Sequence, residues 1–179
     1  MFLGSEEIKR LILEKGMIKN YIDLDLQLQP NGFDLTIEDI HRFTSEGAVY
    51  NKDKNIASID KIFIDGDECW KLYNGTYLMS INETVNLPNN IAAVTIQRSS
   101  LMRSGVTTNI GSWDGGYRGK GYSLLMVHNT NGFTLQRNSR VIQMHFIRIE
   151  GSKFSYNGSY QNENLDKHQI GVLKIPYGI

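Results

Sequence analysis

From about residue 20 onward, the chain consists of short apolar or alternating runs that are separated by Asn, Asp and Gly. Such runs between turn-forming residues are typical of β-strands. No stretch between them is long enough to supply the repeated crossover helices of a parallel sheet. The pattern therefore predicts an antiparallel, mainly β sandwich, barrel or jelly roll, with strands at 62–64, 77–81, 91–97, 122–128 and 141–149.

A helix is predicted before the first of these runs. Ser5 is placed to cap its start and Gly16 is placed to end it. Its apolar face contains Ile8, Leu11 and Ile12. We expect residues 1–20 to form an N-terminal helical segment and the whole chain, residues 1–179, to form a single domain.

Charge and composition exclude several classes of protein. The 19 Lys and Arg residues balance the 19 Asp and Glu residues, so there is no overall attraction to nucleic acid or to an anionic membrane. The single cysteine, Cys69, cannot form an internal disulfide, and the four histidines show no zinc-ligand spacing. With no membrane-length apolar stretch and no signal-peptide pattern, we expect a cytoplasmic protein.

The first segment with chemical potential follows the apolar run that ends near residue 96. It contains Arg98, Ser99, Ser100 and Arg103. A guanidinium group and two hydroxyl groups at the end of a strand suit phosphate oxygens, because they donate several hydrogen bonds with little bulk. The alternative is a solvated turn with no ligand.

A glycine-rich segment, residues 111–121, contains Asp114 and Tyr117. Glycines allow the backbone to approach a ligand closely. A carboxylate beside a triphosphate can hold and deprotonate a water molecule, and a tyrosine ring can lie against a sugar or a base. The alternative is a hairpin turn in which Asp114 only accepts hydrogen bonds from the backbone.

Arg137, Arg140 and Gln143 lie around the start of the predicted strand at 141–149. The two arginines either complete an anion site or are surface charges at a sheet edge. For Arg137 the surface position is the expectation.

The last segment, from about residue 152 to residue 179, is rich in polar residues and contains Tyr160 and Gln161. Few of its side chains can contribute to a core, so it is either a frayed tail or a lid that closes over a ligand. The tyrosines and the glutamine favour the lid.

Over about residues 27–165, these segments resemble, in order and in content, the motifs of the dUTPase/dCTP deaminase superfamily. The corresponding stretches are QLQPNGFDLTI, LPNNIAAVTIQRSSLMRSG, WDGGYRG, NSRVIQMHF and the lid-like YNGSYQ. The resemblance implies a dUTPase-like jelly-roll or β-clip barrel.

The resemblance also implies a role for each matching residue. Asp114 would activate the attacking water, and Tyr117 would pack under the deoxyribose. The residues implied to bind the phosphates or the nucleoside are Arg98, Ser99, Ser100, Arg103 and Gln143, with Tyr160 and Gln161 closing over them. A Mg²⁺ ion would be bound by the triphosphate and water, with Asp34 nearby through water. Members of the superfamily are typically homotrimers with active sites shared between subunits.

One position separates the two activities of the superfamily. The deaminase branch has a glutamate on the strand after the catalytic aspartate, and the alignment on Asn129 places Met126 there. A thioether cannot transfer a proton, whereas phosphoanhydride hydrolysis needs a base, a metal ion and positioning. The sequence therefore favours the dUTPase branch, of archaeal type with a deaminase-like lid, which hydrolyses dUTP to dUMP and pyrophosphate. The alternatives are a dCTP deaminase, including a bifunctional one, and a non-catalytic nucleotide sensor.

Overall fold

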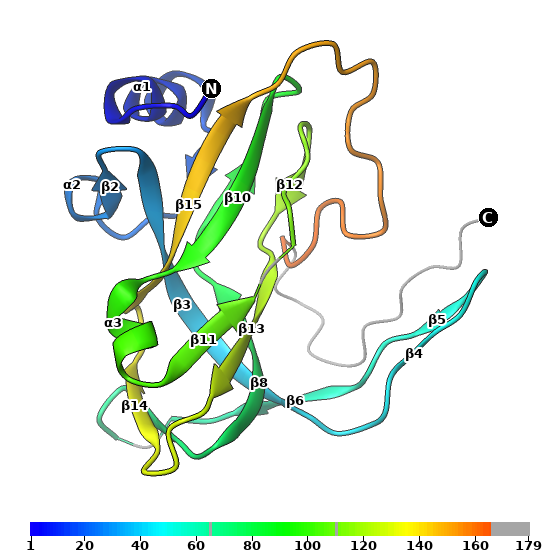
Figure 1. Ribbon diagram of the computed structural model, residues 1–179. Coiled ribbons are helices and arrows are strands. Elements are labelled where there is room, and N and C mark those ends of the chain that lie inside the picture. Colours follow the sequence, from blue (N-terminus) through cyan, green and yellow to red (C-terminus); the bar gives the residue numbers. More distant parts are fainter. Residues whose placement is uncertain (65, 110, 166–179) are drawn as a thin grey trace.

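The protein is described here by a computed structural model, which covers residues 1–64, 66–109 and 111–165 (Figure 1). Its helices are α1 (Ser5–Lys15), α2 (Leu24–Gln27) and α3 (Ser99–Arg103). Its strands are β1 (Ile18–Lys19), β2 (Leu28–Gln29), β3 (Gly32–Phe43), β4 (Ala48–Val49), β5 (Lys54–Asn55), β6 (Ile59–Ile62), β7 (Cys69–Leu72), β8 (Gly75–Ile81), β9 (Thr84–Asn86), β10 (Ile91–Gln97), β11 (Val106–Asn109), β12 (Arg118–Gly119), β13 (Tyr122–Val127), β14 (Phe133–Gln136) and β15 (Arg140–Arg148).

The main sheet contains strands β10, β15, β3, β8, β13 and β11 in that order, and β2 and β6 also pair with β3. All of these pairings are antiparallel. The sheet curls until its outer strands, β10 and β11, come close together, so that it forms a nearly closed barrel. The prediction of an antiparallel, mainly β barrel is therefore confirmed.

Strand β3 is the centre of this barrel, because it pairs with β15 along its first half and with β8 along its second half. Apolar side chains of β3 are completely buried, among them Phe33, Leu35 and Ile37. Burying such a side chain contributes about 1.5–3 kcal/mol, so this strand supplies much of the stability of the fold.

Two small sheets lie beside the barrel. In one, β9 pairs with both β1 and β12, which connects the N-terminal segment to the glycine-rich segment at 111–121. The other joins β14 to β7. A separate hairpin, β4 with β5, projects away from the barrel in Figure 1.

The N-terminal helix forms as predicted, with one correction at its start. Ile8, Leu11 and Ile12 are buried, and Gly16 ends the helix in the left-handed conformation at φ 62°. Ser5, however, does not cap the helix: Gly4 occupies the cap position and Ser5 is already helical. The helical segment is also shorter than residues 1–20, because the chain enters β1 after Gly16.

The predicted strands agree with the structure except in one place. The run at 91–97 coincides with β10, and those at 77–81, 122–128 and 141–149 differ from β8, β13 and β15 by one or two residues at an end. The prediction of a strand at 62–64 is wrong in its position, because the strand β6 lies earlier in the chain and ends at Ile62. The bounds of β6 are decided by its pairing with the end of β3, and this pairing cannot be predicted from a local apolar run.

Candidate active site

Asp34 lies on β3 at the centre of a cluster of charged side chains. Its Oδ2 atom accepts from Nε of Arg98 at 3.1 Å and from Nη1 of Arg140 at 3.4 Å. Gln143 stands opposite Asp34 in the pairing of β15 with β3. Asp34 is only 1% exposed, and its second oxygen, Oδ1, has no hydrogen-bond partner among the described residues.

Burial and charge act on the Asp34 carboxyl in opposite directions. Burial raises its pKa, and the positive charges of Arg98 and Arg140 partly offset that effect. Because the net direction is upward, the two guanidinium groups do not fully replace the water that the carboxylate loses on burial.

Helix α3 directly follows Arg98 and presents Ser99, Ser100 and Arg103 to solvent. A pocket of about 590 Å³ lies beside its start and is lined by Arg98, Ser100 and Arg140, among others. The segment for which a solvated turn was the alternative is thus a short helix that begins at the edge of this pocket. Arg98, Ser100, Asp34 and Gln143 are brought together here, whereas Arg103 is not among the residues that line the pocket.

The glycine-rich segment runs along the other end of β10. The backbones of Trp113 and Ala93 exchange two hydrogen bonds of 2.8 and 2.9 Å. A Cβ atom at Gly115 would collide with the main chain of Asn89, so only glycine permits this close approach. Asp114, between Trp113 and Gly115, is exposed, and its carboxylate has no hydrogen bond or ion pair among the described residues.

Tyr117 is 6% exposed and is covered by two other aromatic rings. Its ring centroid lies 4.9 Å from that of Trp113 and 5.5 Å from that of Tyr156, in edge-to-face geometries. Burial raises the pKa of the Tyr117 hydroxyl well above its usual value. In this chain the ring therefore contacts Tyr156 of its own C-terminal segment.

The C-terminal segment, up to Leu165, lies against the glycine-rich segment of the same chain. Gln161 accepts from the backbone N–H of Arg118 and donates to the backbone oxygen of Gly116, both at 2.9 Å. Tyr160 is partly exposed, and the ammonium group of Lys54 lies 4.8 Å from the centre of its ring. The rest of the predicted lid, residues 166–179, lies outside the described residues.

Comparison with known proteins is decisive for the family. A family model described as dCTP deaminase-like matches residues 2–149. The chain belongs to this family.

The chain is 38% identical to a probable deoxyuridine 5'-triphosphate nucleotidohydrolase of Archaeoglobus fulgidus, over 92% of this chain and 98% of that protein. A protein of Aeropyrum pernix with the same description is 34% identical over 92% of this chain and 100% of its own length.

Among solved structures, the 2'-deoxycytidine 5'-triphosphate deaminase of Agrobacterium tumefaciens matches with a TM-score of 0.65 at 20% identity. The match covers 81% of this chain and 47% of that chain. At this identity the likeness concerns the fold alone, and it confirms the prediction of a dUTPase/dCTP deaminase-like barrel.

In this dCTP deaminase-like chain, Met126 lies on the half-exposed face of β13. Its neighbours along the strand, Leu125 and Val127, point into the core. Met126 stands opposite Thr76 of β8 on one side and Thr107 of β11 on the other. No residue at these three positions carries a group that exchanges protons near neutral pH.

The predicted site residues of one chain form two separate groups. Asp114 directly follows Trp113, and Trp113 pairs with Ala93 of β10. Arg98 lies five residues further along the chain than Ala93, just after the end of β10. At roughly 3.3 Å per residue of strand, the two places are about 17 Å apart. Within one chain, the backbones of Asp114 and Arg98 are therefore not adjacent.

Sequence reasoning missed several charged residues inside the fold. Glu83 is buried and accepts from the Nε2 atom of Gln27 and from the Thr36 hydroxyl, at 2.7 and 2.6 Å. Lys120 is buried beside Glu38. The only signal in the sequence was the position of Lys120 between two glycines, which does not reveal the direction of its side chain.

Within the described ranges, the structure shows neither a helix that is long and apolar enough to cross a membrane nor a group of three or more His, Cys, Asp or Glu residues that could hold a metal ion.

Glu163 predicts a pH dependence for the docking of the C-terminal segment. Burial raises the pKa of its carboxyl to about 7, and no hydrogen bond or ion pair to its carboxyl is found among the described residues. Burial raises the pKa values of the Tyr117 and Tyr122 hydroxyls, and the charge of Glu163 raises them further. Because the docked form binds the proton more tightly, docking is strongest below about pH 4.5 and is lost progressively as the pH rises through 7.

We expect the docking constant to fall about tenfold between pH 6 and pH 8. Hydrogen exchange at the amides of Lys120 and Asn162, which bond across the contact, measures this after correction for intrinsic rates. A Glu163→Gln variant should lose the dependence, since a neutral amide has nothing to titrate. Equal pH dependence in the variant and in the original protein would contradict the expectation.

Proposed function

We propose that the chain hydrolyses dUTP to dUMP and pyrophosphate, with Asp114 as the general base that activates the attacking water. The observation that carries the proposal is the Asp114 carboxylate itself. It is exposed and has no partner among the described residues, while the loop around it is held by backbone hydrogen bonds on both sides. An exposed carboxylate on a fixed loop is what a general base needs, because it is presented to a ligand.

Two features support dUTP as the substrate. The archaeal relatives, matched over nearly their full lengths, are described as probable deoxyuridine 5'-triphosphate nucleotidohydrolases. Met126 and the threonines beside it offer no carboxylate for the proton transfers that deamination of cytosine requires. Hydrolysis of the triphosphate remains chemically possible without that carboxylate.

The distance between the two groups of site residues supports a homotrimer with shared active sites. About 17 Å of β10 backbone separates Ala93, which pairs with the residue before Asp114, from Arg98, so two copies can bring these groups closer together than one chain does. In a closed ring of subunits, Asp114 of one copy meets Arg98 of the next. Each site is then completed by two neighbours.

The remaining predicted residues take roles that agree with their positions. Arg98 and Ser100 hold phosphates from the wall of the basic pocket, and Gln143 supports them from beside Asp34. The other exposed groups assigned to phosphate or nucleoside binding are Ser99, Arg103 and Tyr160, with Gln161 positioned by the loop. Tyr117 receives the deoxyribose once the segment containing Tyr156 moves away.

The Oδ1 atom of Asp34 fits the indirect metal role expected for this residue. In the part of the chain that the structure describes, this oxygen has no donor, whereas Oδ2 is shared by Arg98 and Arg140. It can therefore accept a hydrogen bond from a water of a Mg²⁺ ion, a cation that keeps much of its hydration shell. When bound to the triphosphate, the ion would neutralise charge during hydrolysis. We place the enzyme in the cytoplasm, in keeping with its soluble nucleotide substrate.

The test is to incubate the purified protein with Mg²⁺ and with dUTP, dCTP or dTTP, and to separate the products by chromatography. We expect dUMP and pyrophosphate from dUTP, and unchanged dCTP. A uracil nucleotide formed from dCTP would instead identify a deaminase and contradict the argument from Met126. Tight nucleotide binding without turnover of any of the three would favour a sensor.

A further inference from the structure

We propose that the buried ion pair between Lys120 and Glu38 positions the loop that carries Asp114. The inference rests on the proposed function, since it gives both residues a part in the hydrolysis as positioning residues. Neither residue is among those that the family resemblance assigns to the site.

The loop needs an anchor because it contains five glycines, Gly111, Gly115, Gly116, Gly119 and Gly121. Glycine has more conformational freedom to lose than any other residue, so an ordered glycine-rich loop requires contacts that hold it. Before Asp114, the two backbone hydrogen bonds of Trp113 hold the loop against β10. After it, β12 pairs with β9, and Lys120 follows directly.

Lys120 provides the contact to the main sheet. Its Nζ atom lies 3.2 and 3.3 Å from the two carboxylate oxygens of Glu38. The two residues are 8% and 7% exposed, and within the described ranges this is the only ion pair between residues 111–121 and the barrel. Burial lowers the pKa of the Lys120 ammonium group, while the charges of Glu83 and Asp39 oppose that effect.

A β-bulge aims Glu38 at Lys120. The pairing of β3 with β8 shifts between Ile37 and Asp39, so that Glu38 is the extra residue. Bulges next to functional sites re-aim a side chain in this way. Arg137 holds the bulge, since it donates to the backbone oxygen of Glu38 at 3.1 Å and to the Asp39 carboxylate at 3.0 Å. Arg137 is thus half-buried and ion-paired, which corrects its expected role as a surface charge.

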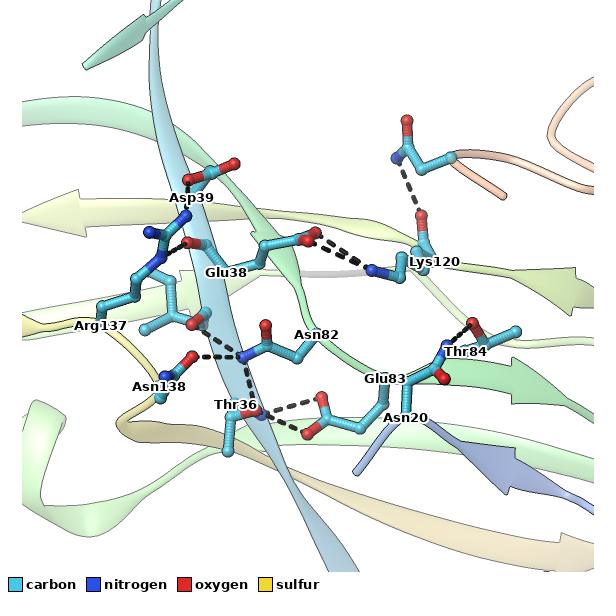
Figure 2. A network of polar contacts seen from close by, with 12 residues as sticks. Asn20, Thr36, Glu38, Asp39, Asn82, Glu83, Thr84, Lys120, Arg137 and Asn138 are labelled. Carbon is cyan, nitrogen blue, oxygen red and sulfur yellow. Dashed lines mark hydrogen bonds and ion pairs between the residues drawn. The ribbon is translucent and has the colours of Figure 1, made fainter. Parts of the chain in front are cut away.

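Figure 2 shows that these contacts form one network across β3. Arg137 and Asn138 lie just before Arg140, which pairs with Asp34, and Asn138 accepts from the Asn82 side chain at 3.1 Å in a separate group of contacts. At the other end, the backbone of Lys120 donates to Glu163 and accepts from the Asn164 side chain. These contacts therefore join the bulge in β3, the Asp114 loop and the C-terminal segment.

An ion pair at this place can fix the position of the loop, which an apolar contact would not do. Two buried charges lose their hydration, and replacing such a pair by apolar residues is often neutral for stability. Apolar side chains, however, have no preferred direction of contact, whereas an ammonium group between two carboxylate oxygens does. The pair defines where the end of the loop lies, and with it the position of Asp114.

The deciding experiment uses the double variant Glu38→Leu/Lys120→Met, which removes both charges and leaves neither one buried alone. We expect an unchanged melting temperature and KM for dUTP, with kcat reduced about 10- to 100-fold, because a displacement of about 1 Å can lower a rate by this much. Hydrogen exchange at the amides of 115–119 should become faster. The matched control is Glu7→Leu/Arg148→Met, which removes the ion pair between α1 and β15 and should leave kcat unchanged.

Each outcome decides the proposal. Unchanged kcat and unchanged amide exchange in a folded double variant would overturn it. If the double variant does not fold, Lys120→Arg takes its place, because it keeps the charge and changes the geometry. A lower kcat at an unchanged melting temperature would support the positioning role. An unchanged kcat would refute it. If the original protein does not hydrolyse dUTP, the proposed function fails, and amide exchange alone then decides whether the pair orders the loop.

Discussion

Replacing Asp114 by Asn is expected to lower kcat for dUTP about 10²- to 10⁴-fold while nucleotide binding is retained. Asparagine has nearly the same shape as aspartate, but it cannot take a proton from water. The fold should not change, because the Asp114 side chain is exposed and makes no hydrogen bond among the described residues. Steady-state kinetics give kcat, and calorimetry with a non-hydrolysable α,β-imido analogue of dUTP gives the affinity.

The matched control for this variant is Asp25→Asn. The Asp25 side chain is 89% exposed and lies in α2, so its amide variant should keep full activity. Activity of Asp114→Asn close to that of the original protein would remove Asp114 from its assigned role. Loss of analogue binding together with activity would mean that the carboxylate holds the substrate and is not the base.

Mixing two inactive variants should restore activity if the sites are shared between subunits. Arg98→Gln removes a phosphate contact and leaves Asp34 with Arg140, while Asp114→Asn removes the base. In an equal, randomly reassembled mixture of the two variants, a site has Asp114 from one copy and Arg98 from the next with a probability of about one quarter. We therefore expect the mixture to recover about one quarter of the original kcat, whereas each variant alone stays inactive.

Dissociation and reassembly are part of the test, because intact oligomers would not exchange subunits. The control is each variant taken alone through the same procedure. An inactive mixture that has demonstrably formed mixed oligomers would contradict the shared site, and would require a single chain to bring Asp114 and Arg98 together by a rearrangement. Sedimentation analysis of the original protein measures the trimer independently.

Much of the fold could be predicted from the sequence because its information is local. The alternation of Tyr122–Val127 places every second side chain in the core, and the structure shows this pattern in β13. Gly16 ends the helix through its own backbone freedom, which depends on no distant contact. The single-domain assignment stays a prediction, since residues 166–179 lie outside the described part of the chain.

The roles of the predicted site residues stay predictions, and the structure shows how these residues are arranged. Motif order selected Asp34, Arg98, Asp114 and Gln143, and it also selected the family, which the match over residues 2–149 confirms. It could not show that Arg98 and Asp114 lie at opposite ends of β10. Nor could it show that Tyr156 covers Tyr117, because both facts depend on contacts between distant parts of the chain.

The sequence by itself determined the strand pattern, the helix at the start and the family, because residue type and spacing carry that information. Only the tertiary structure decided what the charged interior residues do. Glu38 and Lys120 are 82 positions apart in the sequence, and a bulge in β3 turns the first toward the second. A one-residue change of register rotates a side chain to the other face of a strand, and register is decided by the pairing of whole strands.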